Sequence, residues 1–202
     1  MSAKTASSKE LTAILILAAG ASTRLGQPKQ QVIFRGVTLL AATVARACET
    51  GCPVYVVLGA DAEANKKLLE PFAVAVVVDA HWHLGMGHSL KAGLQALLRA
   101  QPALDAVIVS VCDQPFLTTS IFQLLLSQSA PLAACQYKHA WGVPARFSNA
   151  FFSELLGLGD EEGAKKILTR HQHLLAFVSF PQGDLDIDTP ADLLQLKQQD
   201  EQ

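Results

Sequence analysis

The chain has 202 residues, of which 50% are hydrophobic and 17% are charged, and its formal net charge is −2. This length and apolar content predict one globular domain with a full core. The small net charge gives no general attraction to nucleic acid, so phosphate recognition must come from a few locally placed Arg and Lys side chains. We therefore expect a small ligand, and neither nucleic acid nor a membrane as a partner.

The N-terminal segment and the cysteines bear on the cellular compartment of the protein. The opening MSAKTASSKE is polar and lacks the apolar centre of a signal peptide, and the next apolar run ends at Gly20, too early to span a bilayer. We expect residues 1–10 to be disordered, residues 11–199 to form the domain, and the protein to be cytoplasmic. The four cysteines show no paired metal spacing, which favours packing roles for Cys48, Cys52, Cys112 and Cys135.

Short apolar runs alternate with amphipathic segments along the chain. The runs predict strands at residues 12–18, 54–58, 74–78, 106–111, 131–136 and 174–179. The amphipathic segments predict helices at residues 37–49, 61–70, 87–100, 118–129, 148–157, 161–170 and 190–199, with Asp61, Thr118 and Thr189 as N-caps. This order is typical of a single Rossmann-like α/β domain, a mostly parallel sheet with helices on both faces. Ligands of such sheets bind beyond the carboxyl ends of the strands.

The first predicted strand runs into LAAGASTRLGQPK, residues 17–29. Its small residues allow backbone N–H groups to approach a triphosphate closely, while Arg24 and Lys29 place positive charge on the phosphate oxygens. Neither of the two commonest phosphate-loop patterns fits, because Gly26 is followed by Gln27 and no second glycine stands two places after Gly20. The alternative is an ordinary strand-to-helix loop with solvated cations.

Three acidic residues follow predicted strands. Asp113 ends the run at 106–111, and Asp186 and Asp188 alternate around Ile187 beyond the last strand. In an extended segment, residues two apart point the same way, so both carboxylates can face one site while Ile187 enters the core. Mg²⁺ prefers one or two carboxylates together with substrate phosphate oxygens. The sequence predicts a Mg²⁺ site here, and the alternatives are a turn Asp before Pro115 and a solvated acidic loop.

Two further segments carry candidate ligand contacts. In HWHLGMGHSL, Gly85 and Gly87 would allow close backbone approach, and the Ser89 hydroxyl suits a base, ribose or phosphate. The histidines of this segment suggest a transition metal, but a solvated loop is favoured because such a metal wants a tighter ligand set. In WGVPARFS, we expect one wall of an acceptor pocket to be formed by Gly142, Pro144 and Arg146.

Taken together, these motifs resemble the molybdenum cofactor cytidylyltransferases, a branch of the MobA-like nucleotidyltransferases, over about residues 14–194. The segments that carry the resemblance follow in the family's order: LAAGASTRLGQPK, WHLGMGHSLKAGL, CDQP, GVPARF, GDEEGAKKIL and DIDTPADL. The resemblance implies a Rossmann-like nucleotidyltransferase fold and Mg²⁺-dependent transfer of CMP from CTP to the phosphate of molybdopterin-bound molybdenum, releasing pyrophosphate. It also implies a molybdopterin-type cofactor as acceptor, and a molybdenum enzyme or its chaperone as a possible partner.

The resemblance also assigns roles to residues. It implies catalytic roles for Arg24, Lys29 and Asp113, and metal binding by Asp113, Asp186 and Asp188. The guanylyl branch has LAGG where this chain has LAAG, so Ala19 points to cytosine. Asp79 departs from the usual Asn, and Arg146 from an aliphatic residue. The implied nucleotide-binding set is Leu17, Ala18, Ala19, Gly20, Arg24, Lys29, Asp79, Gly85, Gly87, Ser89 and Asp113.

Two other functions stay open at this point. One is nucleotidyl transfer from CTP or another NTP to a different phosphorylated acceptor, such as a sugar phosphate, which would use the same donor loop and metal site. The other is a non-catalytic carrier or maturation factor that binds the molybdenum cofactor. The RLGQPK segment and the three acidic residues argue against the carrier, because it needs no metal-triphosphate site.

Overall fold

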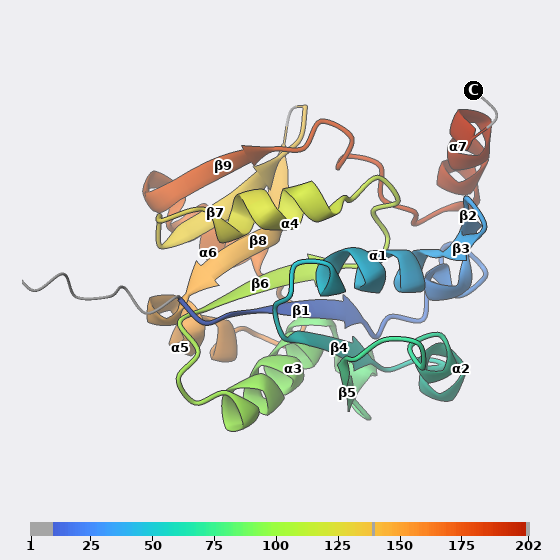
Figure 1. Cartoon of the computed structure of the whole chain (residues 1–202). Coiled ribbons are helices and arrows are strands. Elements are labelled where there is room, and N and C mark those ends of the chain that lie inside the picture. Colours follow the sequence, from blue (N-terminus) through green and yellow to red (C-terminus); the bar gives the residue numbers. More distant parts are fainter. Residues whose placement is uncertain (1–9, 139, 201–202) are drawn as a thin grey trace, which may run out of the picture.

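Seven strands form the central sheet of the computed structural model, which describes residues 10–138 and 140–200 (Figure 1). The strand order is β5-β4-β1-β6-β8-β7-β9, and β8 is antiparallel to both of its neighbours, whereas the other pairs are parallel. The strands are β1 (Thr12–Ala18), β4 (Val54–Leu58), β5 (Ala75–Val78), β6 (Ala106–Val111), β7 (Leu132–Gln136), β8 (Trp141–Ser148) and β9 (Leu175–Ser179).

Helices cover both faces of this sheet. One face packs against α1 (Leu39–Cys48) and α4 (Thr119–Leu126), and the other against α3 (Met86–Ala100), α5 (Phe152–Leu156) and α6 (Lys165–Arg170). Two more helices, α2 (Ala62–Lys67) and α7 (Pro190–Asp200), lie toward the end of the sheet where β1 and β4 finish (Figure 1). The short elements are β2 (Ile33–Phe34), β3 (Val37–Thr38), and the 3-10 turns Lys29–Gln31, Trp82–Leu84, Asn149–Phe151 and Gln172–Leu174.

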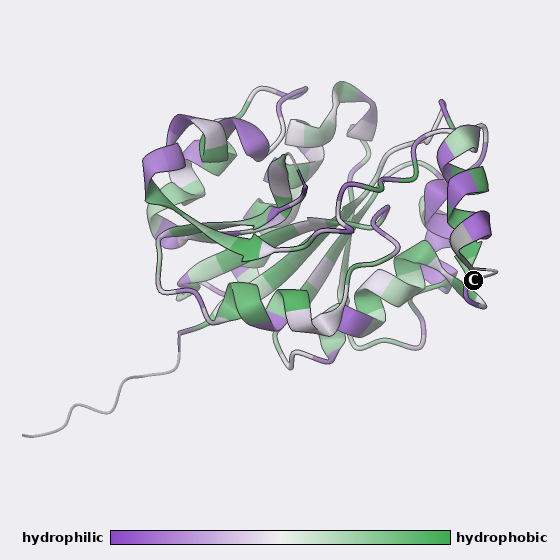
Figure 2. Cartoon of the chain, turned by 90° about the horizontal axis from the view of Figure 1, so that it is seen from above, coloured by the Kyte–Doolittle hydropathy of each residue, from purple (hydrophilic) through white to green (hydrophobic). Residues whose placement is uncertain are grey.

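The residues of β1 show why the sheet is central. Every residue of this strand is buried, with Leu15 and Leu17 in the core cluster that contains α3, and Ile14 and Ile16 in the one that contains α1. A parallel strand covered on both faces needs apolar side chains at successive positions, which is the pattern seen in the sequence. Figure 2 shows the strands as a hydrophobic layer and the helices as mixed in hydropathy.

A third, smaller core cluster joins the two ends of the domain. It contains Leu25, Val32 and Phe34 from the segment after β1, together with Ile187 and Leu196 from the C-terminal segment. Ile187 is fully buried, as its alternation with Asp186 and Asp188 predicts. This packing fixes the glycine-containing loop against the acidic segment near the carboxyl end of β1.

The predicted fold class is confirmed, and the six predicted strands occur within one residue of their expected bounds. The sequence analysis missed β8, because Gly142, Pro144 and Arg146 interrupt the apolar pattern that identifies a strand. The helix expected at 148–157 begins only at Phe152, and the one expected at 161–170 only at Lys165.

Of the three predicted N-caps, the structure confirms Thr189. Thr189 accepts a hydrogen bond from the Asp192 backbone, whereas Asp61 and Thr118 precede their helices without a side-chain cap bond. All of the predicted disordered segment 1–10 except Glu10 falls outside the described residues. In the part of the chain that the structure describes, no helix is both long enough and apolar enough to cross a bilayer.

Candidate active site

Three segments meet beyond the carboxyl ends of β1 and β6: the loop at residues 19–29, the turn at 112–115, and the acidic segment at 186–188. The backbone N–H of Ile187 donates to the carbonyl oxygen of Asp113 at 3.0 Å, which ties the second segment to the third. The loop is tied in turn by the Ser22 hydroxyl, which accepts from the Lys29 backbone at 3.0 Å. The two predicted cations and three predicted acids therefore gather in one place.

Lys29 is the centre of the charge cluster. Its Nζ lies 2.6 Å from Asp113 Oδ2 and 2.6 Å from Asp188 Oδ1, and the Arg24 guanidinium donates to Asp188 Oδ2 at 2.8 Å. Burial alone would lower the pKa of Lys29, but Asp113 and Asp188 outweigh it and raise that pKa above its usual value. Burial would likewise raise the pKa of Asp188, yet its bonds to Lys29 and its proximity to Arg24 hold it below the usual value. Lys29 and Asp188 are therefore both charged.

The raised pKa of Asp186 and an unpartnered oxygen of Asp113 both fit a divalent cation at this place. Burial, and then the charge of Asp113, raise the pKa of Asp186 to about 6. Asp113 Oδ1 is buried and has no hydrogen-bond partner among the described residues. An unpartnered carboxylate oxygen beside a second, electrostatically crowded carboxylate is the arrangement that Mg²⁺ would relieve. The donor set of Asp113, Asp186 and Asp188 therefore fits this ion.

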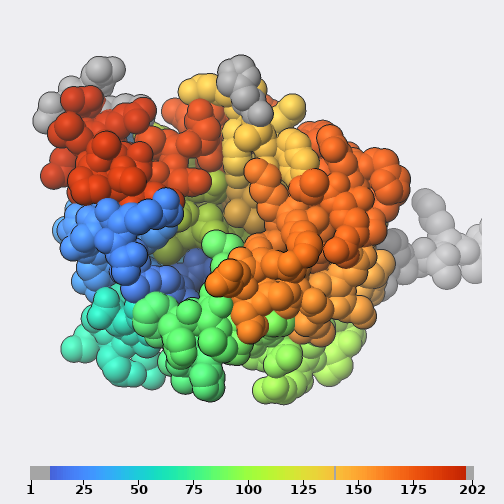
Figure 3. Space-filling view, turned by 180° about the vertical axis from the view of Figure 1, so that it is seen from behind, coloured from blue at the N-terminus to red at the C-terminus, as the bar shows by residue number. Residues whose placement is uncertain are grey.

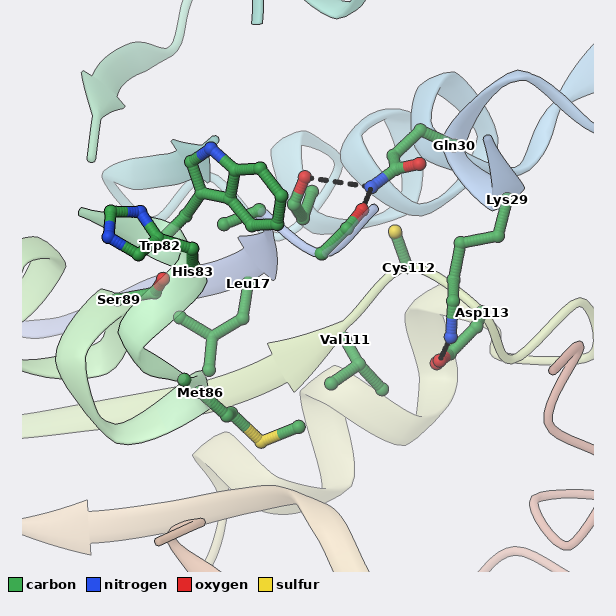
Figure 4. A pocket seen from close by; sticks show the side chains of 14 residues that line it. Leu17, Lys29, Gln30, Trp82, His83, Met86, Ser89, Val111, Cys112 and Asp113 are labelled. Atoms are coloured by element: carbon green, nitrogen blue, oxygen red, sulfur yellow. Dashed lines mark hydrogen bonds and ion pairs between the residues drawn. The ribbon is translucent and has the colours of Figure 1, made fainter. Parts of the chain in front are cut away.

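A cavity of about 260 Å³ lies between the loop after β1 and the start of α3. Figure 3 looks into this hollow, where the blue N-terminal segment meets the green segment. Lys29 and Asp113 lie on one wall and Trp82 and Ser89 on the opposite wall (Figure 4). Of the predicted nucleotide-binding residues, those that line the cavity are Leu17, Ala18, Ala19, Gly20, Lys29, Gly85, Ser89 and Asp113.

Asp79, in contrast, does not line the cavity. It is 4% exposed and lies behind Ser89, whose hydroxyl donates to Asp79 Oδ2 at 2.8 Å. His88 Nδ1 lies 3.0 Å from the same oxygen. Burial would raise the pKa of Asp79, but the hydrogen bonds of His88, Ser89 and the His81 backbone lower it below its usual value. Asp79 acts as an ionised support for a wall residue.

The two glycines at the start of α3 are both packed closely, and only one of them lines the cavity as expected. A Cβ on Gly87 would lie 2.1 Å from the carbonyl oxygen of Gly159, and one on Gly85, where φ is 129°, would lie 2.5 Å from that of Asp160. Both glycines therefore allow close packing against the chain's own segment 159–162. Gly85 also faces the cavity, whereas Gly87 does not.

Arg146 is placed away from the site, contrary to our expectation of an acceptor-pocket wall. It is 3% exposed, donates to the Ala130 carbonyl oxygen at 2.8 Å and pairs with Glu10. Because β8 is antiparallel to β6, its later residues lie toward the amino end of β6: Arg146 is opposite Ile108. Its charge serves the opposite end of the sheet.

Gly142 and Pro144 precede Arg146 on β8 and remain nearer the site. Gly142 pairs with Cys135 in the sheet, and the Val143 carbonyl between the two accepts from Gln114 Nε2 at 3.3 Å. A second hollow, about 600 Å³, lies next to the turn at 112–115. It is lined by Phe116, Lys138, Gln182, Asp184, Leu185, Asp186, Asp192 and Gln195. Asp113 lines the first hollow and Asp186 the second, so the acidic pair lies between them.

Two glutamines that hold the site together were missed in the sequence. Gln30 Nε2 donates to the carbonyl oxygens of Ala18 at 3.0 Å and Gly20 at 2.9 Å, which fixes the loop after β1. Gln114 Nε2 donates to the Gly183 carbonyl oxygen at 3.1 Å. Each follows directly after a predicted charged site residue, in KQ and DQ, and that adjacency was the available signal.

Comparison with known proteins agrees with this geometry. The profile of the MobA-like NTP transferase domain matches residues 14–174. The chain belongs to this family of nucleotidyltransferases. Nicotine blue oxidoreductase from Paenarthrobacter nicotinovorans is 35% identical over 146 residues, which are 70% of this chain but 62% of that relative, so this chain spans less than two thirds of the relative's length.

Solved structures extend the similarity to nearly the whole chain. Rv0371c from Mycobacterium tuberculosis H37Rv superposes with a TM-score of 0.81 at 28% identity, covering 95% of this chain and 100% of that one. Rv0371c in complex with manganese gives a TM-score of 0.77 at 27% identity, covering 92% and 97% of the two chains. The single-domain α/β architecture is therefore that of the family.

Proposed function

We propose that the protein is a Mg²⁺-dependent cytidylyltransferase that transfers CMP from CTP to the phosphate of molybdopterin-bound molybdenum and releases pyrophosphate. The observation that carries this proposal is the position of Asp113 and Asp186 between two hollows. Lys29 lies on the side of the first hollow, together with the loop after β1. A metal ion held by such a carboxylate pair would orient two phosphorylated substrates at their boundary.

The first hollow would take the donor nucleotide. The triphosphate would lie along the backbone at Ala19 and Gly20, with open space at Gly20, and against Lys29. Arg24, which pairs with Asp188 outside the cavity lining, would reach its far end. The base would then lie on the wall formed by Trp82 and Ser89. Ala19 in the LAAG segment supports cytosine as this base, by the resemblance to the cytidylyl branch.

The residues of the site supply positioning and charge rather than a covalent intermediate. Asp113, Asp186 and Asp188 would hold Mg²⁺, which neutralises phosphate charge when bound. A triphosphate offers Lys29 and Arg24 new anionic partners in place of Asp113 and Asp188, so its arrival frees the carboxylates for the ion. The acceptor phosphate is itself anionic and can attack the α-phosphorus directly, while Lys29 and Arg24 stabilise the departing pyrophosphate.

The second hollow would take the acceptor. It adjoins Asp186 and carries one Lys and two further Asp side chains among its described lining residues, so it suits a polar molecule. Lys138 pairs with Asp184 at 3.2 Å, and an acceptor phosphate could draw this exposed ammonium group away from Asp184. Gly142 and Pro144, on the strand behind Gln114, complete the proposed acceptor side.

Substrate assays test this proposal directly. Purified protein is incubated with molybdopterin-bound molybdenum and each of the four NTPs, with Mg²⁺, and pyrophosphate release is measured. We expect pyrophosphate release in the presence of the acceptor with CTP, and not with the other three NTPs. Release only with a sugar phosphate as acceptor would instead identify the related transferase. Absence of CTP and GTP binding in calorimetry would favour a cofactor carrier.

A further inference from the structure

The segment between β5 and α3 brings two histidines and a carboxylate together. The potential ligand atoms of Asp79, His81 and His88 all lie within 4.8 Å of one another. Asp79 Oδ2 and His88 Nδ1 are 3.0 Å apart, and the ring centroids of His81 and His88 are 5.7 Å apart. The chain reverses at Trp82–Leu84 and Gly85, so the first turn of α3 returns His88 to Asp79.

The negative charge of Asp79 is not neutralised by a Lys or Arg among the described residues. Asp79 is 4% exposed, and its carboxylate accepts hydrogen bonds from the His81 backbone at 2.9 Å and the Ser89 hydroxyl at 2.8 Å. Its one ion-pair partner within residues 10–138 and 140–200 is the His88 ring, so no Lys or Arg of these ranges supplies a permanent positive charge. Burying a carboxylate without such a charge is costly, and a bound cation would compensate it.

The ligand set decides which cation fits. Two imidazoles with one carboxylate suit Zn²⁺ and similar transition-metal dications, whereas Mg²⁺ prefers oxygen ligands alone. Bonds of about 2.0 Å put two ligands of a tetrahedral zinc ion about 3.3 Å apart, close to the separation of the Asp79 and His88 atoms. His81 is exposed and gives the ion access from solvent.

We propose that Asp79, His81 and His88 form a site for a Zn²⁺-class dication, separate from the Mg²⁺ carboxylates. The site borders the nucleotide cavity, because Asp79 Oδ2 also accepts from Ser89, which lines that cavity. A bound ion would hold the turn at Trp82–Leu84 against α3 and stiffen this wall. His83, which lines the cavity instead, is outside the ligand set.

Metal titration of the full chain tests the site. The chain has two tryptophans, so Trp141→Phe leaves Trp82 as the sole tryptophan reporter. Asp113→Ala removes one carboxylate ligand of the other candidate metal site. In this background we expect one Zn²⁺ per chain in calorimetry, and quenching of Trp82 fluorescence by Co²⁺. His81→Ala and His88→Ala should each weaken both signals about tenfold or more. The exposed His173→Ala, and His83→Ala, are the matched controls.

Three results would overturn the site: no Zn²⁺ bound by the folded background protein, affinity unchanged in both His81→Ala and His88→Ala, or an equal loss in His83→Ala. His81 is exposed, so its replacement leaves the core intact, and far-ultraviolet circular dichroism checks this for each variant. CTP binding is measured separately on protein with an intact Asp113. Its failure would remove the proposed transferase function and leave the zinc result standing.

Discussion

Lys29 bridges two carboxylates at 2.6 Å each, so its replacement removes the main positive charge of the donor side. We predict that Lys29→Ala lowers kcat for pyrophosphate release from CTP by about 10² to 10³, the usual cost of losing one preorganised electrostatic contact. Asp113→Ala should lose more. Lys166→Ala, at an exposed helical ion pair with Glu162, is the control and should retain full activity. Near-normal turnover by Asp113→Ala would refute the metal assignment.

Cys135 shows how burial of a single residue makes stability depend on pH. It is fully buried, and this burial raises its pKa to about 12. Unfolded thiols titrate near pH 8.5, so the folded state keeps a proton that the unfolded state releases. The contribution is complete below about pH 8.5 and is lost as pH rises from there toward the folded pKa.

Urea denaturation at pH 8 and pH 10 measures this effect. Between these pH values, the wild type should lose about 2 kcal/mol more unfolding free energy than Cys135→Ala, which has no thiol to titrate. Comparing the two proteins cancels the other groups that titrate in this range. Equal losses would show that Cys135 reaches solvent in the native state.

At the scale of elements, α3 is positioned by the contact of its first turn with residues 159–162. A Cβ on Gly87 would meet carbonyl oxygens of Gly159 at 2.1 Å and Glu162 at 2.6 Å, and backbone atoms cannot move aside cheaply. We predict that Gly87→Ala lowers the unfolding free energy by about 1 to 3 kcal/mol. Gly163→Ala, whose Cβ would meet only the Met86 sulfur at 3.4 Å, should change it by about 0.5 kcal/mol or less. Urea midpoints compare them, and equal values would contradict this packing.

Elements also show what the sequence could predict and where it failed. Strands such as β1 are buried on both faces, so their apolar runs identify them without tertiary information. The antiparallel β8 contains Gly, Pro and a buried Arg whose partners, Ala130 and Glu10, are distant in sequence. The same limit applies to Asp79 and Gly87. The family resemblance suggested a nucleotide contact for Asp79 and the residue type suggested one for Gly87, but long-range packing places both outside the cavity lining. Local pattern predicted elements and strand-end chemistry, whereas side-chain direction depended on tertiary contacts.

For the whole molecule, the decisive contact joins the two ends of the chain. Lys29 and Arg24 follow β1, and Asp188 precedes α7, yet their side chains form ion pairs across a cluster closed by Leu25 and Ile187. Asp113 and Asp188 are therefore already paired with Lys29 or Arg24 without ligand, and a divalent ion must compete with Lys29 for them. A triphosphate that draws Lys29 away removes this competition. Binding of Mg²⁺ and CTP should consequently be cooperative, each favouring the other equally.

Thermal denaturation measures this coupling because ligands that bind only the native state raise the midpoint. We predict that Mg²⁺ alone shifts the midpoint little, and that Mg²⁺ with CTP shifts it by more than the sum of the separate shifts. Typical coupling free energies of about 1 to 3 kcal/mol correspond to a 5- to 150-fold gain in affinity, which calorimetry can quantify. The Asp113→Ala variant should lose the excess shift. Equal Mg²⁺ affinity with and without CTP would show that Lys29 does not compete with Mg²⁺ for the carboxylates.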